Sequence, residues 1–221
     1  HMKQEYPATP EEAFEASETN AFLTDMRLWD ACQQPIPPLD PHTPCVLALD
    51  GAESNDTFAS VLVSAWGDGF AARYSRPYVP SPGQALDFDE IEIDLRELGQ
   101  KHAISELTYD PMLLGQLIRR LQQPARLARK ATPDHFISYP AFPAPCVPFP
   151  QGQQRLEADK GLYDLITQRR YAHAGDPALR EHVANANKKI GSDGRSLRIV
   201  KREYAKKIDS LVCLSMATAR A

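Results

Sequence analysis

The stretch Cys45-Val46-Leu47-Ala48-Leu49-Asp50 decides the fold, because it is a continuous apolar run that ends in a carboxylate. Apolar residues at successive positions, rather than at alternate ones, are typical of a strand buried on both faces. Such a strand lies inside a sheet that has helices packed on each side. The stretch therefore predicts the central strand of a layered α/β domain, with Asp50 at its end.

The residues that follow predict two more strands, over 58–65 and 70–79. They are joined by Trp66-Gly67-Asp68-Gly69, in which the glycine and aspartate residues favour a tight hairpin. Because hairpins connect antiparallel neighbours, we expect the first three strands of the domain to be antiparallel.

Helices alternate with the later strands. A helix capped by Asp87 is expected to reach about His102, and a strand over 104–109 ends at Asp110-Pro111, because proline cannot donate to a ladder. Asp193-Gly194 predicts a type I′ hairpin. Further helices are expected over 113–121, 156–170, 177–187 and from Ile208 onward, with a short strand inside 140–150. The order predicts an α/β fold with a mixed sheet flanked by helices.

Residues 1–44 differ from the rest of the chain. His1-Met2 has the character of a tag remnant, the segment 9–12 has the pattern of a helix capping box, and the prolines of 35–44 indicate an extended linker. We interpret 1–44 as an interdomain arm that packs on the main domain or as the tail of an upstream domain. The main domain is expected to span 45–221.

Composition places the chain among globular proteins, with 43% hydrophobic and 24% charged residues. No apolar run approaches the length of a membrane span. The four cysteines form no metal-binding or redox motif, so we expect buried thiols in a reducing compartment. They are Cys32, Cys45, Cys146 and Cys213.

The formal net charge of −4 conceals a strong division along the chain. Residues 1–110 carry 6 Lys and Arg against 20 Asp and Glu, whereas residues 111–221 carry 19 against 9. A basic half of this size can hold a polyanion such as nucleic acid. The alternative is that the two halves attract each other within the fold, and charge alone does not decide between them.

Three aspartates occupy positions that packing alone would not choose. Asp50 ends an apolar strand, Asp110 ends another strand, and Asp209 lies beside the buried face of the last helix. A carboxylate in such a place is costly unless it is paired or binds a metal. If the two strands are neighbours, Asp50 and Asp110 share a sheet edge, to which the last helix can bring Asp209.

Converging carboxylates raise one another's pKa unless a cation neutralises them, and hard oxygen ligands favour Mg²⁺ or Mn²⁺. Two such ions activate water and stabilise a leaving oxygen in phosphodiester hydrolysis. Each aspartate also has a simpler reading as a helix or turn cap, as at Asp110-Pro111. Asp56 is expected to shape the turn after Asp50 and to support the metal ligands.

Basic residues complement these acids near the Asp193-Gly194 hairpin and before Asp209. Such residues could bind along the phosphate backbone of DNA. Each of them is explained equally well as a charged residue exposed to solvent on a hairpin or at a helix end. His173 and His182 are candidates to assist, with surface positions the commoner case. The candidate DNA-binding residues are Lys188, Lys189, Arg195, Lys201, Arg202 and Lys206.

An ordered set of short motifs adds a resemblance. The motifs are Tyr6 to Phe14, Leu47-Ala48-Leu49-Asp50-Gly51, Ser54-Asn55-Asp56, Tyr109-Asp110-Pro111, Pro150-Gln151-Gly152, His173 to Leu179, Asn185-Ala186 and Lys207-Ile208-Asp209. Together they resemble the C-terminal part of the large terminase subunits of tailed bacteriophages, the motors that package and cut DNA. The segment 127–149 departs from the family pattern.

The resemblance implies an RNase H-like nuclease domain with Asp50, Asp110 and Asp209 as ligands of two Mg²⁺ or Mn²⁺ ions. It implies cleavage of double-stranded concatemeric viral DNA during packaging, in the cytoplasm of a bacterial host. The implied partners are the ATPase domain of the same subunit, the portal and the small terminase subunit, with no membrane. No G-x-x-x-x-G-K-[ST] loop is present, so this chain alone is not expected to be a motor.

Two other functions remain open at this point. One is an RNase H-like module that binds DNA or docks packaging proteins but does not cut without the ATPase half. The other is an actin-like phosphotransferase, which the acid at Glu53, where a phosphate would lie, makes the weaker interpretation.

Overall fold

The computed structural model describes residues 21–51, 57–81, 83–112, 114–191, 196–203 and 205–221. Its main sheet has the strand order β7-β4-β1-β2-β3-β8. The strands are β1 (Cys45–Gly51), β2 (Phe58–Trp66), β3 (Gly69–Tyr78), β4 (Ile104–Tyr109), β7 (Cys146–Pro148) and β8 (Tyr171–Ala172). The pairs β1–β2 and β2–β3 are antiparallel, whereas β4 is parallel to both β1 and β7. The predicted mixed sheet and its antiparallel first three strands are confirmed.

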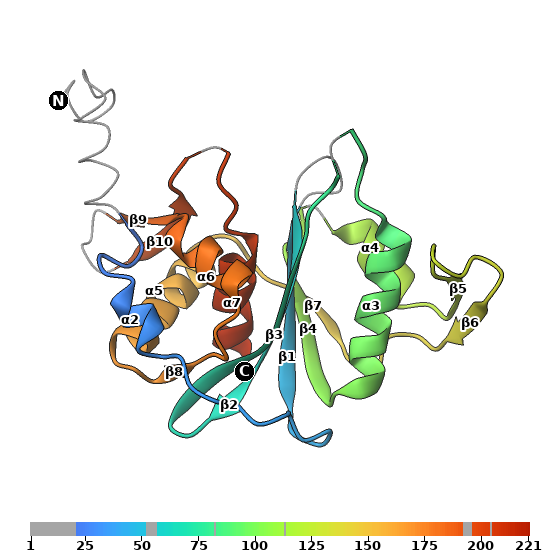
Figure 1. Ribbon diagram of the computed structural model, residues 1–221, viewed down its shortest axis with the longest axis horizontal. Helices are drawn as coiled ribbons and strands as arrows, with labels where there is room; N and C mark the ends of the chain where they lie inside the picture. Colours follow the sequence, from blue (N-terminus) through green and yellow to red (C-terminus); the bar gives the residue numbers. More distant parts are fainter. Residues whose placement is uncertain (1–20, 52–56, 82, 113, 192–195, 204) are drawn as a thin grey trace.

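Helices cover both faces of this sheet, as Figure 1 shows. One layer holds α2 (Arg27–Asp30), α5 (Gln153–Thr167), α6 (Pro177–Ala184) and α7 (Asp209–Arg220), and the other holds α3 (Phe88–Lys101) and α4 (Gly115–Leu121). Along β1, Val46 and Ala48 join the core cluster under α7, whereas Leu47 and Leu49 join the cluster under α3. The central apolar run is therefore buried on both faces, as predicted.

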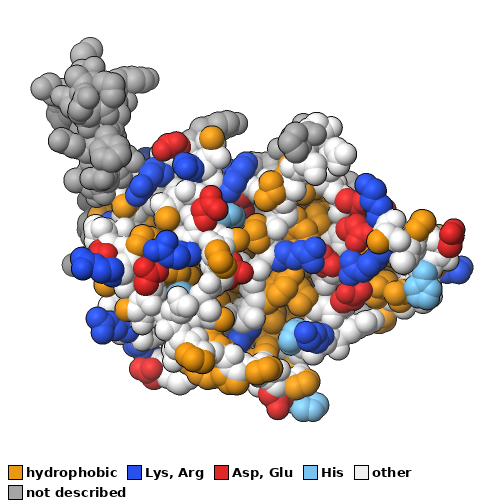
Figure 2. Space-filling model, in the orientation of Figure 1, with side chains coloured by type: hydrophobic (Ala, Val, Ile, Leu, Met, Phe, Trp, Pro, Cys, Tyr) orange, Lys and Arg blue, Asp and Glu red, His pale blue; other side chains and the backbone are white. Residues whose placement is uncertain are grey.

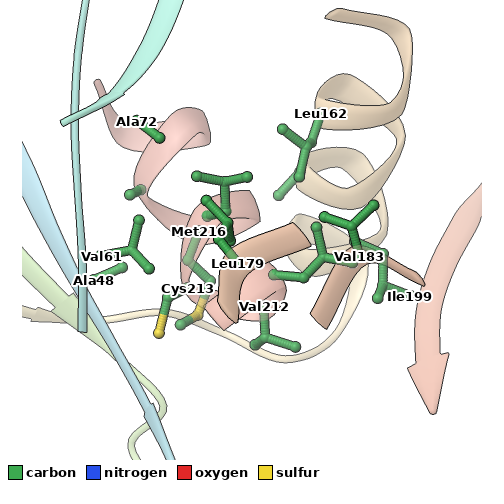
Figure 3. Packing of buried hydrophobic residues seen from close by; sticks show 14 of the residues in the cluster. Ala48, Val61, Ala72, Leu162, Leu179, Val183, Ile199, Val212, Cys213 and Met216 are labelled. Carbon is green, nitrogen blue, oxygen red and sulfur yellow. The ribbon is translucent and has the colours of Figure 1, made fainter. Parts of the chain in front are cut away.

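The larger core cluster lies between the sheet and α5, α6 and α7. Figure 3 shows Ala48 and Val61 of the sheet facing Met216 of α7, with Leu162 of α5 and Val183 of α6 behind them. Burying each of the larger side chains contributes about 1.5–3 kcal/mol. This packing holds α7 against β1 and β2.

The chain before β1 contributes to the same cluster. Phe22, Leu23, Trp29 and Cys32 are buried in it, so the described part of the arm packs on the main domain. The expected capping-box helix at 9–12 lies outside the described residues. All four cysteines are free thiols. Among the described helices, none has the length and apolar character to span a membrane.

Two small antiparallel hairpins complete the structure: β9 (Ala186–Ile190) with β10 (Leu197–Lys201), and β5 (Ala125–Ala128) with β6 (Phe136–Tyr139). The pairing of β9 with β10 confirms the hairpin predicted there, although Asp193-Gly194 lies outside the described residues. The hairpin β5–β6, within the proline-rich part of the chain, was not predicted.

The predicted limits of two helices were wrong. The helix expected over 156–170 begins earlier, at Gln153, and ends at Thr167. The helix expected to reach 187 ends at Ala184, because Ala186 already pairs with Lys201 in the β9–β10 hairpin. Pairing of distant residues therefore sets the end of α6, whereas α5 ends just before Arg169, whose φ of +58° is left-handed.

Candidate active site

The parallel strands β1, β4 and β7 end at one edge of the sheet. Their register places Leu49 beside Tyr109, and Tyr109 beside Pro148. Asp50 follows Leu49 on β1 and Asp110 directly follows β4, so the two strands are neighbours as expected and both acids lie at this edge. In open α/β sheets, the carboxyl ends of the strands are where ligands bind.

Helix α7 brings Asp209 to the same edge. Asp209 is the first residue of α7 and is only 7% exposed. The Oγ1 of Thr57 donates a hydrogen bond of 2.6 Å to Asp209 Oδ2, and Thr57 directly precedes Phe58, the partner of Gly51 on β1. This bond fastens the start of α7 to the end of β1. No pattern in the sequence pointed to Thr57.

The charges of the other two aspartates act on the Asp50 carboxyl group. The pKa of Asp50 is raised to about 7, first by burial and then by the charges of Asp209 and Asp110, while the nearby Arg155 opposes the shift. Mutual repulsion of this kind is relieved when a cation enters between the carboxylates.

The donor chemistry fits a hard divalent cation, since every candidate ligand is a carboxylate oxygen. Within the described ranges, however, no three His, Cys, Asp or Glu side chains are gathered closely enough to hold a metal ion. One oxygen of Asp110 accepts a hydrogen bond of 2.9 Å from the Met112 N–H, as the turn interpretation predicts. Asp56 lies outside the described residues.

A buried cation that the sequence did not reveal stands behind the acids. Arg155, at the start of α5, is 2% exposed, and its Nε donates to Asp159 Oδ1 at 2.7 Å. Asp159 also accepts hydrogen bonds from the Ser215 hydroxyl and the Ile199 N–H. The pair therefore ties α5 to α7 and β10. Its only sequence signal is the i,i+4 spacing of opposite charges on one helix.

The register of β9–β10 separates the candidate DNA-binding residues by face. Lys188 pairs with the buried Ile199, and its Nζ lies over the Tyr163 ring at 4.5 Å, so it packs against α5. Lys189 is exposed and pairs with Arg198, a basic residue that the sequence did not single out.

Three of the other predicted basic residues are described after Arg198. Arg202 lies near the end of β10 and donates to Asn187 Oδ1 at 3.3 Å. Lys201 is partly buried and Lys206 is exposed. Arg195 lies outside the described residues.

The two candidate histidines are buried, contrary to the surface position considered commoner. Nδ1 of His182 accepts the Ser210 N–H at 2.9 Å beside Asp209, and burial lowers the pKa of His182. His173 stacks on Trp29 with 4.0 Å between ring centroids. His182 therefore helps hold the start of α7, whereas His173 belongs to the packing of the arm.

Solved structures of terminases and of their nuclease domains resemble this chain. The large terminase of bacteriophage HK97 matches 91% of this chain at 18% identity with a TM-score of 0.70. The large terminase nuclease of thermophilic phage G20c with bound magnesium matches 91% at 10% identity and 0.59. The large terminase of a second thermophilic bacteriophage matches 97% at 10% identity and 0.62.

The lengths matched differ among these structures. The chain spans 43% of the HK97 protein and 52% of the large terminase from the second thermophilic phage, but it matches 97% of the G20c nuclease. No protein-family model and no curated protein matches the sequence. At these identities the likeness concerns the fold. The chain therefore has the RNase H-like fold of the large terminase nucleases, with a six-stranded mixed sheet between two helical layers.

Proposed function

We propose that this chain is a metal-dependent endonuclease that cuts double-stranded concatemeric viral DNA during genome packaging, as the nuclease part of a phage large terminase. The observation that carries the proposal is that Asp50 and Asp110 lie at the carboxyl ends of neighbouring strands and Asp209 lies near enough to raise the pKa of Asp50, in a sheet with the terminase nuclease fold. Hydrophobic packing does not explain any of the three, because each is an acid near one end of an apolar strand or helix.

The three aspartates would divide the binding of two Mg²⁺ or Mn²⁺ ions. Asp50, between the other two, would contact both ions, and Asp110 and Asp209 would each complete one site. Ions held there would activate a water and stabilise the leaving oxygen of a phosphodiester. Thr57 orients Asp209 through its hydrogen bond, and His182 holds the backbone at Ser210.

The comparisons support divalent metal and terminase partners for this proposal. Structures of the G20c nuclease contain bound magnesium in one case and bound cobalt in another. Structures of the large terminase from the second thermophilic phage contain ADP or ATP-γ-S. For this chain we accordingly propose an upstream ATPase domain reached through residues 1–44, the portal and small terminase subunit as further partners, and the bacterial host cytoplasm as location.

A supercoiled-plasmid assay tests the proposal. The wild-type chain should nick DNA with Mn²⁺ or Mg²⁺ and not in EDTA, and Asp50→Asn and Asp209→Asn should each abolish nicking. Asp164→Asn is the matched control, because Asp164 is a carboxylate of α5 that pairs with the exposed Lys160. Circular dichroism melting should show that the Asp50 variant remains folded.

Two outcomes would contradict the assignment. Undiminished nicking by Asp50→Asn would remove Asp50 from the site. Retardation of DNA without nicking under any metal condition, by a folded wild-type chain, would instead support the RNase H-like binding or docking module.

A further inference from the structure

The amino end of α5 lies at the same sheet edge as the aspartates. The Phe149 N–H, just after β7, donates to the Tyr109 carbonyl at 2.8 Å, and α5 begins at Gln153. Its N-cap residue is Gly152, no side chain caps it, and its first turn contains no acid. A Cβ at Gly152 would meet nothing within 4 Å, so the space beyond is open. The first N–H groups of the helix and the helix dipole therefore present positive potential there.

A buried guanidinium adds an independent sign of an anionic ligand. Arg155 is the third residue of α5, and its Nη1 donates to Gln151 Oε1 at 3.2 Å, on the amino side of the helix. Its Nη2 is buried and has no hydrogen-bond partner among the described residues. A buried donor without a partner costs about 1–3 kcal/mol, and more when it is charged. The negative charge of an anion at the start of α5 would lower the cost of burying the Arg155 charge.

A second guanidinium is held against the first by the same glutamine. Arg198 Nη1 donates to the Gln151 carbonyl at 2.9 Å, and its Nη2 lies 3.4 Å from Gln151 Oε1. Arg198 is partly exposed and makes no ion pair with any residue in the described ranges. The pKa of Arg198 is lowered, first by burial and then by the charge of Arg155, and the charges of Asp159, Asp110 and Asp50 offset this only in part, so a further anion beside Arg198 would favour its charged form.

We infer that the start of α5, with Arg155, Arg198 and Gln151, forms a subsite for a backbone phosphate of the bound DNA. Arg198 contacts the phosphate from the solvent side, with the planar donor geometry that suits phosphate oxygens. Arg155 and Gln151 are positioning residues: Gln151 fixes the Arg198 guanidinium, and Arg155 supplies charge from behind. The inference rests on the proposed function, because it takes DNA to be the ligand.

The subsite explains why basic side chains lie near the aspartates at this edge of the sheet. Phosphodiester cleavage requires the strand to be held against the aspartates, and metal ligands alone do not fix its register. Lys189 pairs with Arg198 across β9–β10, so the same face of the hairpin extends the contact along the backbone. Phosphate contacts of this kind position DNA without reading its sequence.

Binding of a fluorescent DNA duplex in EDTA, followed by anisotropy over a range of salt, tests this subsite apart from cleavage. Arg198→Gln should weaken binding roughly tenfold and lower the slope of log affinity against log salt by about 0.9. Arg198→Lys should keep the slope, because it keeps the charge, yet recover only part of the affinity. Arg126→Gln is the matched control, since Arg126 is exposed on β5 in the opposite layer and stacks on Phe136.

Further variants and a second assay distinguish a loss of DNA binding from a loss of folding. Gln151→Met keeps the size of the side chain but loses the shared acceptor, and it should weaken binding if Arg198→Gln proves too unstable to measure. In a plasmid assay with Mn²⁺, Arg198→Gln should nick more slowly than Arg126→Gln. If the wild type binds and cuts DNA while Arg198→Gln and Gln151→Met both behave like Arg126→Gln, the subsite is wrong and the nuclease stands. If the wild type neither binds nor cuts, the proposed function itself is wrong.

Discussion

Arg155 shows how one residue can serve both the packing and the site. Its ion pair with Asp159 has side-chain exposures of 2% and 0%, whereas the pair Lys160–Asp164 on the same helix has exposures of 40% and 39%. Both pairs have the same i,i+4 spacing. Their energetic roles differ, because removing one partner of a buried pair leaves an uncompensated charge in the interior.

We therefore expect Arg155→Met to lower the free energy of unfolding by about 3–5 kcal/mol. Lys160→Met, the exposed counterpart, should change it by less than about 1 kcal/mol. Urea denaturation of both variants at neutral pH measures the difference. Equal effects of the two substitutions would show that the Arg155–Asp159 pair does not hold α5 to α7 and β10.

At the scale of elements, the β2–β3 hairpin depends on two glycines for different reasons. Gly67 has φ +58° and open space around it, whereas a Cβ on Gly69 would lie 1.8 Å from the Arg170 carbonyl oxygen. Gly67 is required for its backbone conformation. Gly69 is required because the backbone of Arg170 approaches it closely: the Phe70 N–H donates to the Arg170 carbonyl just before β8.

Gly69→Ala should accordingly destabilise the protein by about 3 kcal/mol, because the backbone before β8 must move. Gly67→Ala should cost about 1 kcal/mol, the penalty of a left-handed conformation for alanine. Thermal unfolding of the two variants gives the comparison. A larger loss in Gly67→Ala would contradict the close packing of Gly69 against Arg170.

Lys188 and Lys189 are neighbours on β9 but have different surroundings. Lys188 lies over Tyr163 and hydrogen-bonds to its hydroxyl at 3.2 Å, whereas Lys189 is exposed opposite Arg198. Alternation along a strand therefore predicts which lysine faces DNA.

Lys189→Gln should weaken duplex binding several-fold and lower its salt slope by about 0.9. Lys188→Gln should leave the salt slope nearly unchanged and lower thermal stability slightly, because the charge it removes is packed on Tyr163. Anisotropy titrations at several salt concentrations decide the matter. Equal loss of slope in both variants would mean that the hairpin does not present one face to DNA.

Across the whole molecule, ion pairs account for much of the charge division along the chain. Arg129 contacts Glu90, Asp94 and Glu97 of α3, so a basic residue of the second half neutralises acids of the first. Arg180 does the same for Asp30. Figure 2 shows positive and negative side chains alternating over the α3 side. The two halves of the chain therefore attract each other within the fold.

Whole-molecule stability should also depend on pH through His173. Its Nε2 lies 2.9 Å from the Trp29 carbonyl and its Nδ1 accepts the Gly175 N–H, so the ring is neutral in the fold. Burial lowers the pKa of His173 below its ordinary 6.5, and Trp29, Asp30 and Asp176 offset this only in part. The unfolded chain therefore takes up the proton first, and stability is complete above about pH 6.5 and lost as the pH falls below it.

Substitution should reveal this contribution. Between about pH 7.5 and about pH 5.5, His173→Gln should lose less unfolding free energy than the wild type, although it is less stable at the higher pH. His135→Gln, at an exposed position, should follow the wild type. Urea denaturation at the two pH values measures these losses. A wild-type slope retained in His173→Gln would assign the pH dependence to other groups.

The sequence by itself determined most strands of the sheet and the acids near their ends, although it did not predict β8. Cys45 to Asp50 predicted a central strand because continuous apolar character is a local property, and Asp110-Pro111 marked a strand end because proline removes a donor. The hairpin β2–β3 could also be predicted, because the residues that favour a tight turn are neighbours in the sequence.

Only the tertiary structure decided which groups surround those acids. Thr57, Arg155 and Arg198 come from three separate elements, and their meeting depends on how α5, α7 and β10 pack rather than on any local pattern. The end of α6 and the burial of His182 were likewise set by contacts with distant segments. Neighbouring residues determine where helices and strands form. A site built from several helices and strands forms only when burial of apolar side chains packs them together.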